Sequence, residues 1–321
     1  MPYKIGQLPS EMATQDEIAD YLEVKCLLSA DNSFSIVEAA EDNGFVEDED
    51  TVETLETDAY ISYADALLQI DERNRIITNS RYPFVGEQNS ISLSDGCSEY
   101  FKTIYTFLLF ATRWKMGAER IIQEKDGTLL FERLCNSVLV NYFGQHAKGM
   151  VFGTGEQSNE KGFEEKIKRM LDRFAEKGYL FRRPDGDRNH QKDGKVDLLA
   201  FIPFNDSRKG HFIAFGQCKT GTSWREKLGQ LNPRNFSDLF IQPPLVFPPV
   251  CIYMVSEACD DDWEQLARSS NGVLFDRMRI MQFVPDSIDN DLYNDIAIWI
   301  QGVKNLILKH NPDTILTLGT F

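Results

Sequence analysis

Three polar residues near the ends of two expected strands have side chains that could act together chemically. Asp197 begins the first strand, and Gln217 and Lys219 end the second. Because side chains alternate along a strand, Gln217 and Lys219 lie on one face and Cys218 on the other. If the strands form a hairpin, the polar groups meet at one end of a sheet. A carboxylate beside an ammonium group can hold a divalent ion and stabilise negative charge on a phosphate.

The sequence around these residues predicts the elements that would position them. Two β-type runs, 196–204 and 211–219, are joined by a polar turn and predict a hairpin. Helical spacing over 129–142 ends at Gly144, as a helix with a glycine cap would. The other elements expected in this half are helices over 163–174, 223–231, 262–267 and 287–308 and strands over 250–255 and 279–284. This alternation predicts the α/β class.

An Asp on one strand of a hairpin with Glu or Gln-x-Lys on the next resembles the PD-(D/E)XK, or restriction-endonuclease-like, nuclease superfamily. The resemblance covers residues 125–285, and the run from Asp193 to Lys227 looks like the defence-associated members. It implies a mixed sheet flanked by helices and an acidic residue on the helix before the hairpin. Glu132 is the candidate for that residue, with Asp193 and Glu164 as alternatives.

The resemblance also implies a site for Mg²⁺, or Mn²⁺, which prefers oxygen ligands. Lys219 would orient the attacking water and stabilise charge developing on the phosphate. Gln217 stands where Glu is commoner and brings no negative charge, so we expect weaker metal binding. The implied metal ligands are Asp197, Glu132, Gln217 and the backbone carbonyl of Cys218.

The charge distribution is compatible with a nucleic-acid partner despite a net charge of −16. Residues 1–60 hold 16 acidic residues against two lysines, whereas residues 161–235 hold 17 lysines and arginines against 10 acidic residues. Basic residues in one region are typical of a surface that faces phosphate, although a solvated face of mixed charge is the simpler interpretation. Arg225 and Lys227 are the candidate phosphate contacts, and Trp224 is interpreted as a packing residue.

The N-terminal part is expected to be a separate region. We place an acidic, mainly helical region at 1–123 and the nuclease-like domain at 124–321. The acidic run 38–58 is interpreted as a solvated loop, with a partner-binding segment as the alternative, and 97–123 is expected to form one long helix.

Composition excludes several classes of protein. No apolar run approaches the length of a membrane span, and the first residues lack the apolar core of a secretory signal. The six cysteines form no C-x-x-C pair, which disfavours a zinc knuckle or a disulfide framework. We therefore expect a cytoplasmic protein with reduced, buried thiols and without a membrane partner. His190 and His211 are expected to be exposed and outside the chemistry.

The leading hypothesis is a magnesium-dependent endonuclease that cuts DNA, with RNA as an alternative substrate, in restriction-type or antiviral defence. A catalytically inactive nuclease-fold module that binds nucleic acid or a partner subunit is the alternative. Because the chain carries no ATP-binding motif, a partner ATPase or helicase is a third hypothesis, and a homo-oligomer also stays open.

Overall fold

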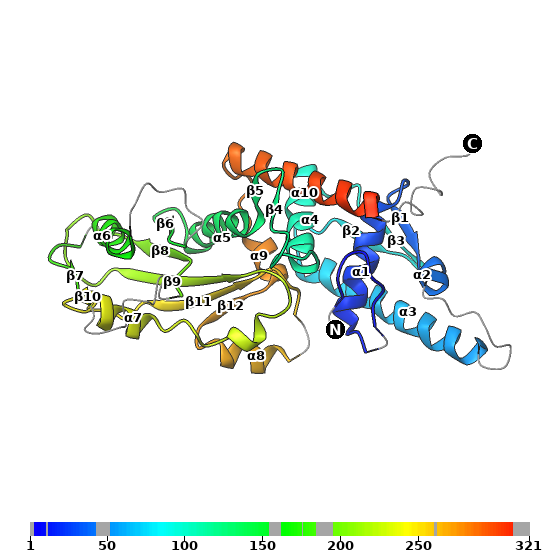
Figure 1. Cartoon of the computed structure of the whole chain (residues 1–321), viewed down its shortest axis with the longest axis horizontal. Coiled ribbons are helices and arrows are strands. Elements are labelled where there is room, and N and C mark those ends of the chain that lie inside the picture. Colours follow the sequence, from blue (N-terminus) through cyan, green and yellow to red (C-terminus); the bar gives the residue numbers. More distant parts are fainter. Residues whose placement is uncertain are drawn as a thin grey trace.

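The computed structural model describes residues 3–10, 12–42, 52–153, 162–174, 176–183, 195–259 and 262–310, without the side chains of 40–61 and 310. Asp193 and His190 lie outside these ranges. Figure 1 shows a five-stranded sheet towards one end of the molecule and the first three helices towards the other. The fold is α/β, as predicted. In the described part of the chain, no helix is both long and apolar enough to cross a bilayer.

The large sheet is built around the predicted hairpin. Its strands β8 (Leu198–Ile202) and β9 (Phe212–Lys219) pair antiparallel. The strand β11 (Val250–Val255), also predicted, runs parallel to β9. At the edges, β12 (Val273–Phe275) is parallel to β11, and β6 (Lys148–Val151) is antiparallel to β8. The sheet is therefore mixed, and β9 is its central strand.

Alternating side chains of the sheet separate two layers of hydrophobic core. Cys218 on β9 belongs to the layer that includes α5 (Gly127–Phe143), whereas Phe215 belongs to the layer that includes α6 (Phe163–Arg173). The helix α5 ends at Gly144, whose φ of 90° is accessible to glycine at little cost, so the predicted end is confirmed.

The smaller elements complete this half of the molecule. The helices α7 (Pro233–Phe240) and α8 (Trp263–Ser269) contribute to the same core layer as α6. Two short pairs flank the sheet: β7 (Leu180–Phe181) with β10 (Ile241–Gln242), and β4 (Ile121–Ile122) with β5 (Lys125–Asp126).

The first part of the chain is mainly helical, as predicted, and adds a small antiparallel sheet that was not. The helices are α1 (Gln15–Leu28), α2 (Ile36–Asp42), α3 (Val52–Ile76) and α4 (Glu99–Arg113). The strands β1 (Ser33–Ser35), β3 (Ser90–Leu93) and β2 (Phe84–Gly86) pair in that spatial order. Parts of the acidic run 38–58 are helical in α2 and α3, so the loop interpretation is wrong for those parts.

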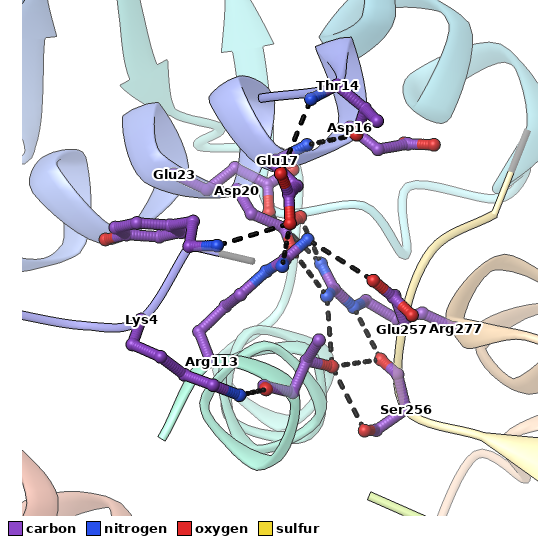
Figure 2. Close-up of polar contacts among 12 residues, drawn as sticks. Lys4, Thr14, Asp16, Glu17, Asp20, Glu23, Arg113, Ser256, Glu257 and Arg277 are labelled. Carbon is purple, nitrogen blue, oxygen red and sulfur yellow. Dashed lines mark hydrogen bonds and ion pairs between the residues drawn. The ribbon is translucent and has the colours of Figure 1, made fainter. Parts of the chain in front are cut away.

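A buried ion cluster joins this first part to the rest of the chain. We define it as the carboxylates Asp16, Asp20 and Glu23 of α1 with three arginines, Arg73 of α3, Arg113 of α4 and Arg277. Figure 2 shows the three carboxylates with Arg113 and Arg277. The guanidinium of Arg277 donates to both carboxylate oxygens of Asp20, at 2.8 and 2.9 Å. Because all three arginine side chains are fully buried, the pairing fixes the relative positions of four helices.

The fourth of these helices corrects the sequence interpretation. Residues 279–284 were expected to form a strand, but α9 (Arg277–Phe283) is a helix. Asp276 caps it by accepting a hydrogen bond from the backbone of Arg279, which commits the segment to a helical turn. The helix expected over 287–308 is present as α10 (Asn290–His310).

Two other expected helices are shorter than predicted. The helix over 97–123 ends at Arg113, after which the chain turns into β4 and β5, with Gln123 and Glu124 at positive φ between them. Of 223–231, only Arg225–Lys227 forms a short 3₁₀ turn, and Gly229 has a φ of 77°, which is incompatible with a continuing helix.

Candidate active site

The structure brings Asp197 and Lys219 together at one end of the hairpin. Asp197 immediately precedes β8, and its backbone is fixed because its N–H donates to Gly216 and its carbonyl accepts from Phe152 and Gly153. Its carboxylate Oδ2 accepts from the backbone N–H of Cys218 at 2.8 Å and lies 3.6 Å from Lys219 Nζ. The anionic and cationic groups therefore lie side by side, as the resemblance implies.

Glu132 approaches the same place from α5. Its Oε2 is buried and has no hydrogen-bond partner among the described residues. Burial, and after it the nearby charge of Asp197, raises the pKa of Glu132 to about 8, although the ammonium of Lys219 opposes the shift. Two neighbouring carboxylates repel each other when both are ionised, so ionising the second one costs free energy. Such pairs of carboxylates are common at functional sites, including those that bind a cation.

Gly153 leaves the room that Glu132 occupies. A Cβ on Gly153 would lie 2.7 Å from Glu132 Oε2, a distance that real Cβ atoms do not tolerate. The sequence analysis did not single out this glycine. A glycine following a strand is a weak signal for close backbone approach, and no spacing rule connects it to a helix residue 21 positions earlier.

Lys166 is a second residue that the sequence analysis did not single out. It lies on α6, and its Nζ donates to the backbone carbonyls of Gly153 at 2.9 Å and Phe152 at 3.4 Å. Its charge lowers the pKa of Glu132, against the larger effect of burial. In the sequence, Lys166 is only a lysine beside the apolar stripe of an amphipathic helix. Because lysines are common at such positions on solvated helices, this pattern does not indicate a functional residue.

The remaining predicted ligands lie on β9. Gln217 is 1% exposed, and its Oε1 has no hydrogen-bond partner within the described part of the chain. The Cys218 thiol is buried against Cys135, and burial raises its pKa well above the usual range. The thiol therefore contributes to the core. This agrees with the sequence analysis, in which the backbone carbonyl of Cys218, and not its thiol, was the candidate metal ligand.

The other candidates are arranged differently. Glu164 forms ion pairs with Lys168 at 2.7 Å and Arg183 at 3.0 Å, so its carboxylate has partners away from Asp197 and Lys219. His211 is buried and not exposed as expected; its Nδ1 lies 3.0 Å from the carbonyl of Phe174.

The two predicted phosphate contacts follow Lys219 on one loop. Lys227 is exposed, and Arg225 bonds through NH1 to Glu257 at 2.5 Å. Trp224 is buried, as expected for a packing residue, and its Nε1 also donates to Glu257. Glu257 in turn lies 3.8 Å from Arg113 of the buried ion cluster, so this loop is tied to the N-terminal region.

A pocket of about 540 Å³ opens beside these groups. Glu132 and Lys219 both line it, together with Lys227 and with residues of the turn that follows α4. Gln217 is not among its lining residues, so the structure does not bring the amide into this pocket.

The carboxylate and amide oxygens near this place are of the chemical type that a hard divalent cation prefers. Two buried oxygens without partners, Glu132 Oε2 and Gln217 Oε1, lie on elements that flank Asp197, and such orphaned acceptors call for a ligand, water or proton. Across the described residues, no group of three or more His, Cys, Asp or Glu side chains could hold a metal ion. A metal here would therefore depend on two carboxylates supplemented by amide or backbone oxygens.

Comparisons with known proteins give no family for this chain: no family model matches it, and neither does any curated protein or solved structure.

Proposed function

We propose that this protein is a metal-dependent nuclease of the PD-(D/E)XK type that hydrolyses phosphodiester bonds of DNA. The observation that carries the proposal is the Asp197 carboxylate 3.6 Å from the Lys219 ammonium at the end of a hairpin, with the buried carboxylate of Glu132 beside them. A restriction-type role in defence against foreign DNA is part of the proposal and rests on the sequence resemblance.

Each side chain has a defined part in this proposal. Asp197 and Glu132 would hold Mg²⁺ or Mn²⁺, with Gln217 and the carbonyl of Cys218 as further oxygen donors. The bound ion would supply Lewis acidity and a water of lowered pKa. Lys219 positions the attacking water and stabilises negative charge on the phosphate, while the Cys218 N–H keeps the Asp197 carboxylate in place.

The test is a cleavage assay on plasmid DNA with Mg²⁺ or Mn²⁺, with RNA as a second substrate. Asp197→Asn keeps an oxygen for the Cys218 N–H but removes the charge, and Lys219→Ala removes the ammonium. We expect both variants to lose at least about 100-fold in rate, in line with the removal of an electrostatic stabiliser.

Matched controls come from the opposite end of the same hairpin. Asp206→Asn and Lys209→Ala make the same chemical changes at an exposed and a half-buried position away from the site, and both variants should cleave as the wild type does. Cleavage that persists in Lys219→Ala would show that the activity resides elsewhere.

A second function is favoured by one observation, the amide of Gln217 in place of a third carboxylate. With only two carboxylates, the fold would bind nucleic acid or a partner subunit without cutting. Calorimetry separates the two proposals: a Mg²⁺ or Mn²⁺ binding heat that is lost in Asp197→Asn supports the nuclease, and no heat in the wild type supports the inactive module.

A further inference from the structure

The pocket beside the candidate active site is strongly cationic. Its lining includes five lysines or arginines against one carboxylate, Glu132, in a chain whose net charge is −16. We call these five residues the phosphate pocket cations: Lys4, Lys115, Arg120, Lys219 and Lys227. Three of them, Lys4, Lys115 and Arg120, belong to the N-terminal region, which the sequence analysis described as acidic and mainly helical.

The turn that carries two of these cations is held rigidly against α5. The carbonyl of Arg120 accepts hydrogen bonds from the backbone of Gly127 at 2.9 Å and from Trp299 Nε1 at 3.0 Å. Gly127 has no space for a side chain, because a Cβ there would lie 2.8 Å from the Trp299 ring and 2.9 Å from Met116. The backbone under Lys115 and Arg120 is thus a fixed wall of the pocket.

The side chains of this wall are nevertheless available to a ligand. Lys115 Nζ lies 4.0 Å from Glu119, and Arg120 Nε lies 3.2 Å from Asp126. Both cations are more than half exposed, and exposed ion pairs of this kind contribute little free energy. A phosphate can therefore replace these carboxylates at small cost.

Lys4, near the start of the chain, also lines the pocket. Its Nζ donates to the carbonyl of Thr112 at 3.3 Å, one residue before Arg113 of the buried ion cluster, as Figure 2 shows. The backbone N–H of Ile5 donates to the carbonyl of Arg113 at 3.1 Å. Lys4 and Ile5 are therefore held against the end of α4, beside the pocket.

A second pocket shows that this charge is particular to one side of α5. Its volume is about 940 Å³, and it is lined by α5 residues such as Leu129 and Arg133, whereas Thr128 and Glu132 line the first pocket. These two sets lie on different faces of the helix, about 100° apart around its axis. The second pocket has three cations against five carboxylates, which are Glu124, Asp126, Asp289, Asp291 and Asp295. Only the first of these two pockets suits a polyanion.

We propose that the phosphate pocket cations hold the backbone of a single DNA strand that runs from Lys219 across the N-terminal region. A volume of about 540 Å³ is in the range of pockets that enclose one small ligand, about 300–1,000 Å³. It has room for a short length of one strand. The pocket is the substrate-binding part of the proposed nuclease and so rests on that function, but strand binding is measured independently of cleavage.

The experiment measures binding of a fluorescein-labelled single-stranded oligonucleotide by anisotropy, in EDTA so that no cleavage occurs, across a range of salt concentrations. The double variant Lys115→Ala/Arg120→Ala removes two cations of the N-terminal wall. Each lost phosphate contact on a single strand lowers the slope of log K against log salt by about 0.7, so we expect a decrease of about 1.4 and about a tenfold weaker affinity at 0.1 M salt.

The matched control is Arg208→Ala/Arg268→Ala. Like Lys115 and Arg120, these arginines are exposed and pair with carboxylates, at 2.8 and 3.3 Å, but they do not line the pocket. The control has the same change in net charge and should bind as the wild type does. Circular dichroism verifies that both double variants are folded.

Three outcomes would overturn the inference: no binding of the single strand by the wild type, equal losses in the test and control variants, or a blunt duplex bound as tightly as the single strand. If the expected binding pattern is found while plasmid cleavage is absent under all metals tested, the strand pocket stands and the proposed nuclease activity fails.

Discussion

The buried ion cluster and the candidate active site both gather charged groups inside the protein, but they treat those charges in opposite ways. Burial alone would raise the pKa of Asp20, yet the guanidinium groups of Arg277, Arg113 and Arg73 hold it well below its usual range. At the site, burial and the charge of Asp197 together raise the pKa of Glu132. In the cluster, the carboxylate of Asp20 is paired with three arginines. At the site, Glu132 Oε2 has no hydrogen-bond partner among the described residues.

This difference distinguishes charges that serve the fold from charges that await a ligand. A buried carboxylate with three arginine partners is already neutralised and has no capacity left for a cation. A carboxylate oxygen buried without a hydrogen bond is a cost that a structure usually retains for binding or catalysis. The presence of buried charge therefore indicates less about function than the degree to which that charge is paired.

Breaking the cluster should give the largest effect on stability. Asp20→Ala leaves three buried arginines short of a carboxylate, and removing one partner of a buried ion pair costs about 3–5 kcal/mol. Urea unfolding measures the loss. Arg75→Ala, which breaks an exposed pair with Glu72, should leave the midpoint unchanged. A loss in Asp20→Ala as small as that in the control would show that the cluster does not stabilise the fold.

Filling the space beside Glu132 should give an intermediate effect on stability and a large one on activity. Gly153→Ala places a Cβ where the carboxylate lies, so Glu132 must move, at a cost of about 1–3 kcal/mol for overpacking. We expect plasmid cleavage to fall while the protein stays folded, as followed by thermal melting. Gly96→Ala adds a methyl group that comes no closer than 3.7 Å to another atom, away from the pocket, and should retain both stability and cleavage.

The smallest expected effect, over any one pH unit, is a dependence of stability on pH. The pKa of Glu132 rises from 4.5 in the unfolded chain to about 8 in the fold, so the native state binds the extra proton between these values. Stability of the metal-free protein therefore decreases as pH rises from about 4.5 to 8, by about 1.4 kcal/mol for each pH unit in the middle of that range, and levels off above 8.

Comparison with variants isolates this contribution. Glu132→Gln should lack this component of the pH dependence and be more stable than the wild type at pH 9, as measured by urea unfolding at a series of pH values. Glu226→Gln changes an exposed carboxylate and should keep the slope of the wild type. A wild-type slope retained in Glu132→Gln would mean that another group titrates.

Local patterns in the sequence were sufficient for the hairpin and for α5. The hairpin has two β-type runs around a polar turn, and α5 has helical spacing up to Gly144, so each is specified within its own segment. The strand expected at 279–284 shows the limit of such patterns, because a short apolar run fits either a strand or a buried helix. Asp276 three residues before Arg279 was the available signal for a helix cap.

The residues of the candidate site also fall into two groups, those that local sequence patterns predicted and those that they did not. Asp197 and Lys219 lie on adjacent strands of one hairpin, and their proximity followed from strand geometry. Gly153 and Lys166 reach the site from other elements, so only tertiary packing brings them there. The buried ion cluster was not predicted at all, because its partners are far apart in the sequence and isolated arginines and carboxylates are most often solvated.

The bond between Arg277 and Asp20 joins residues 257 positions apart, which has a consequence for how the protein is made. At a synthesis rate of about 5–20 residues per second, the ribosome needs on the order of tens of seconds to reach the arginine after it has added the aspartate. During that interval the first helix lacks its last cationic partner, so its final docking is a late event in biogenesis.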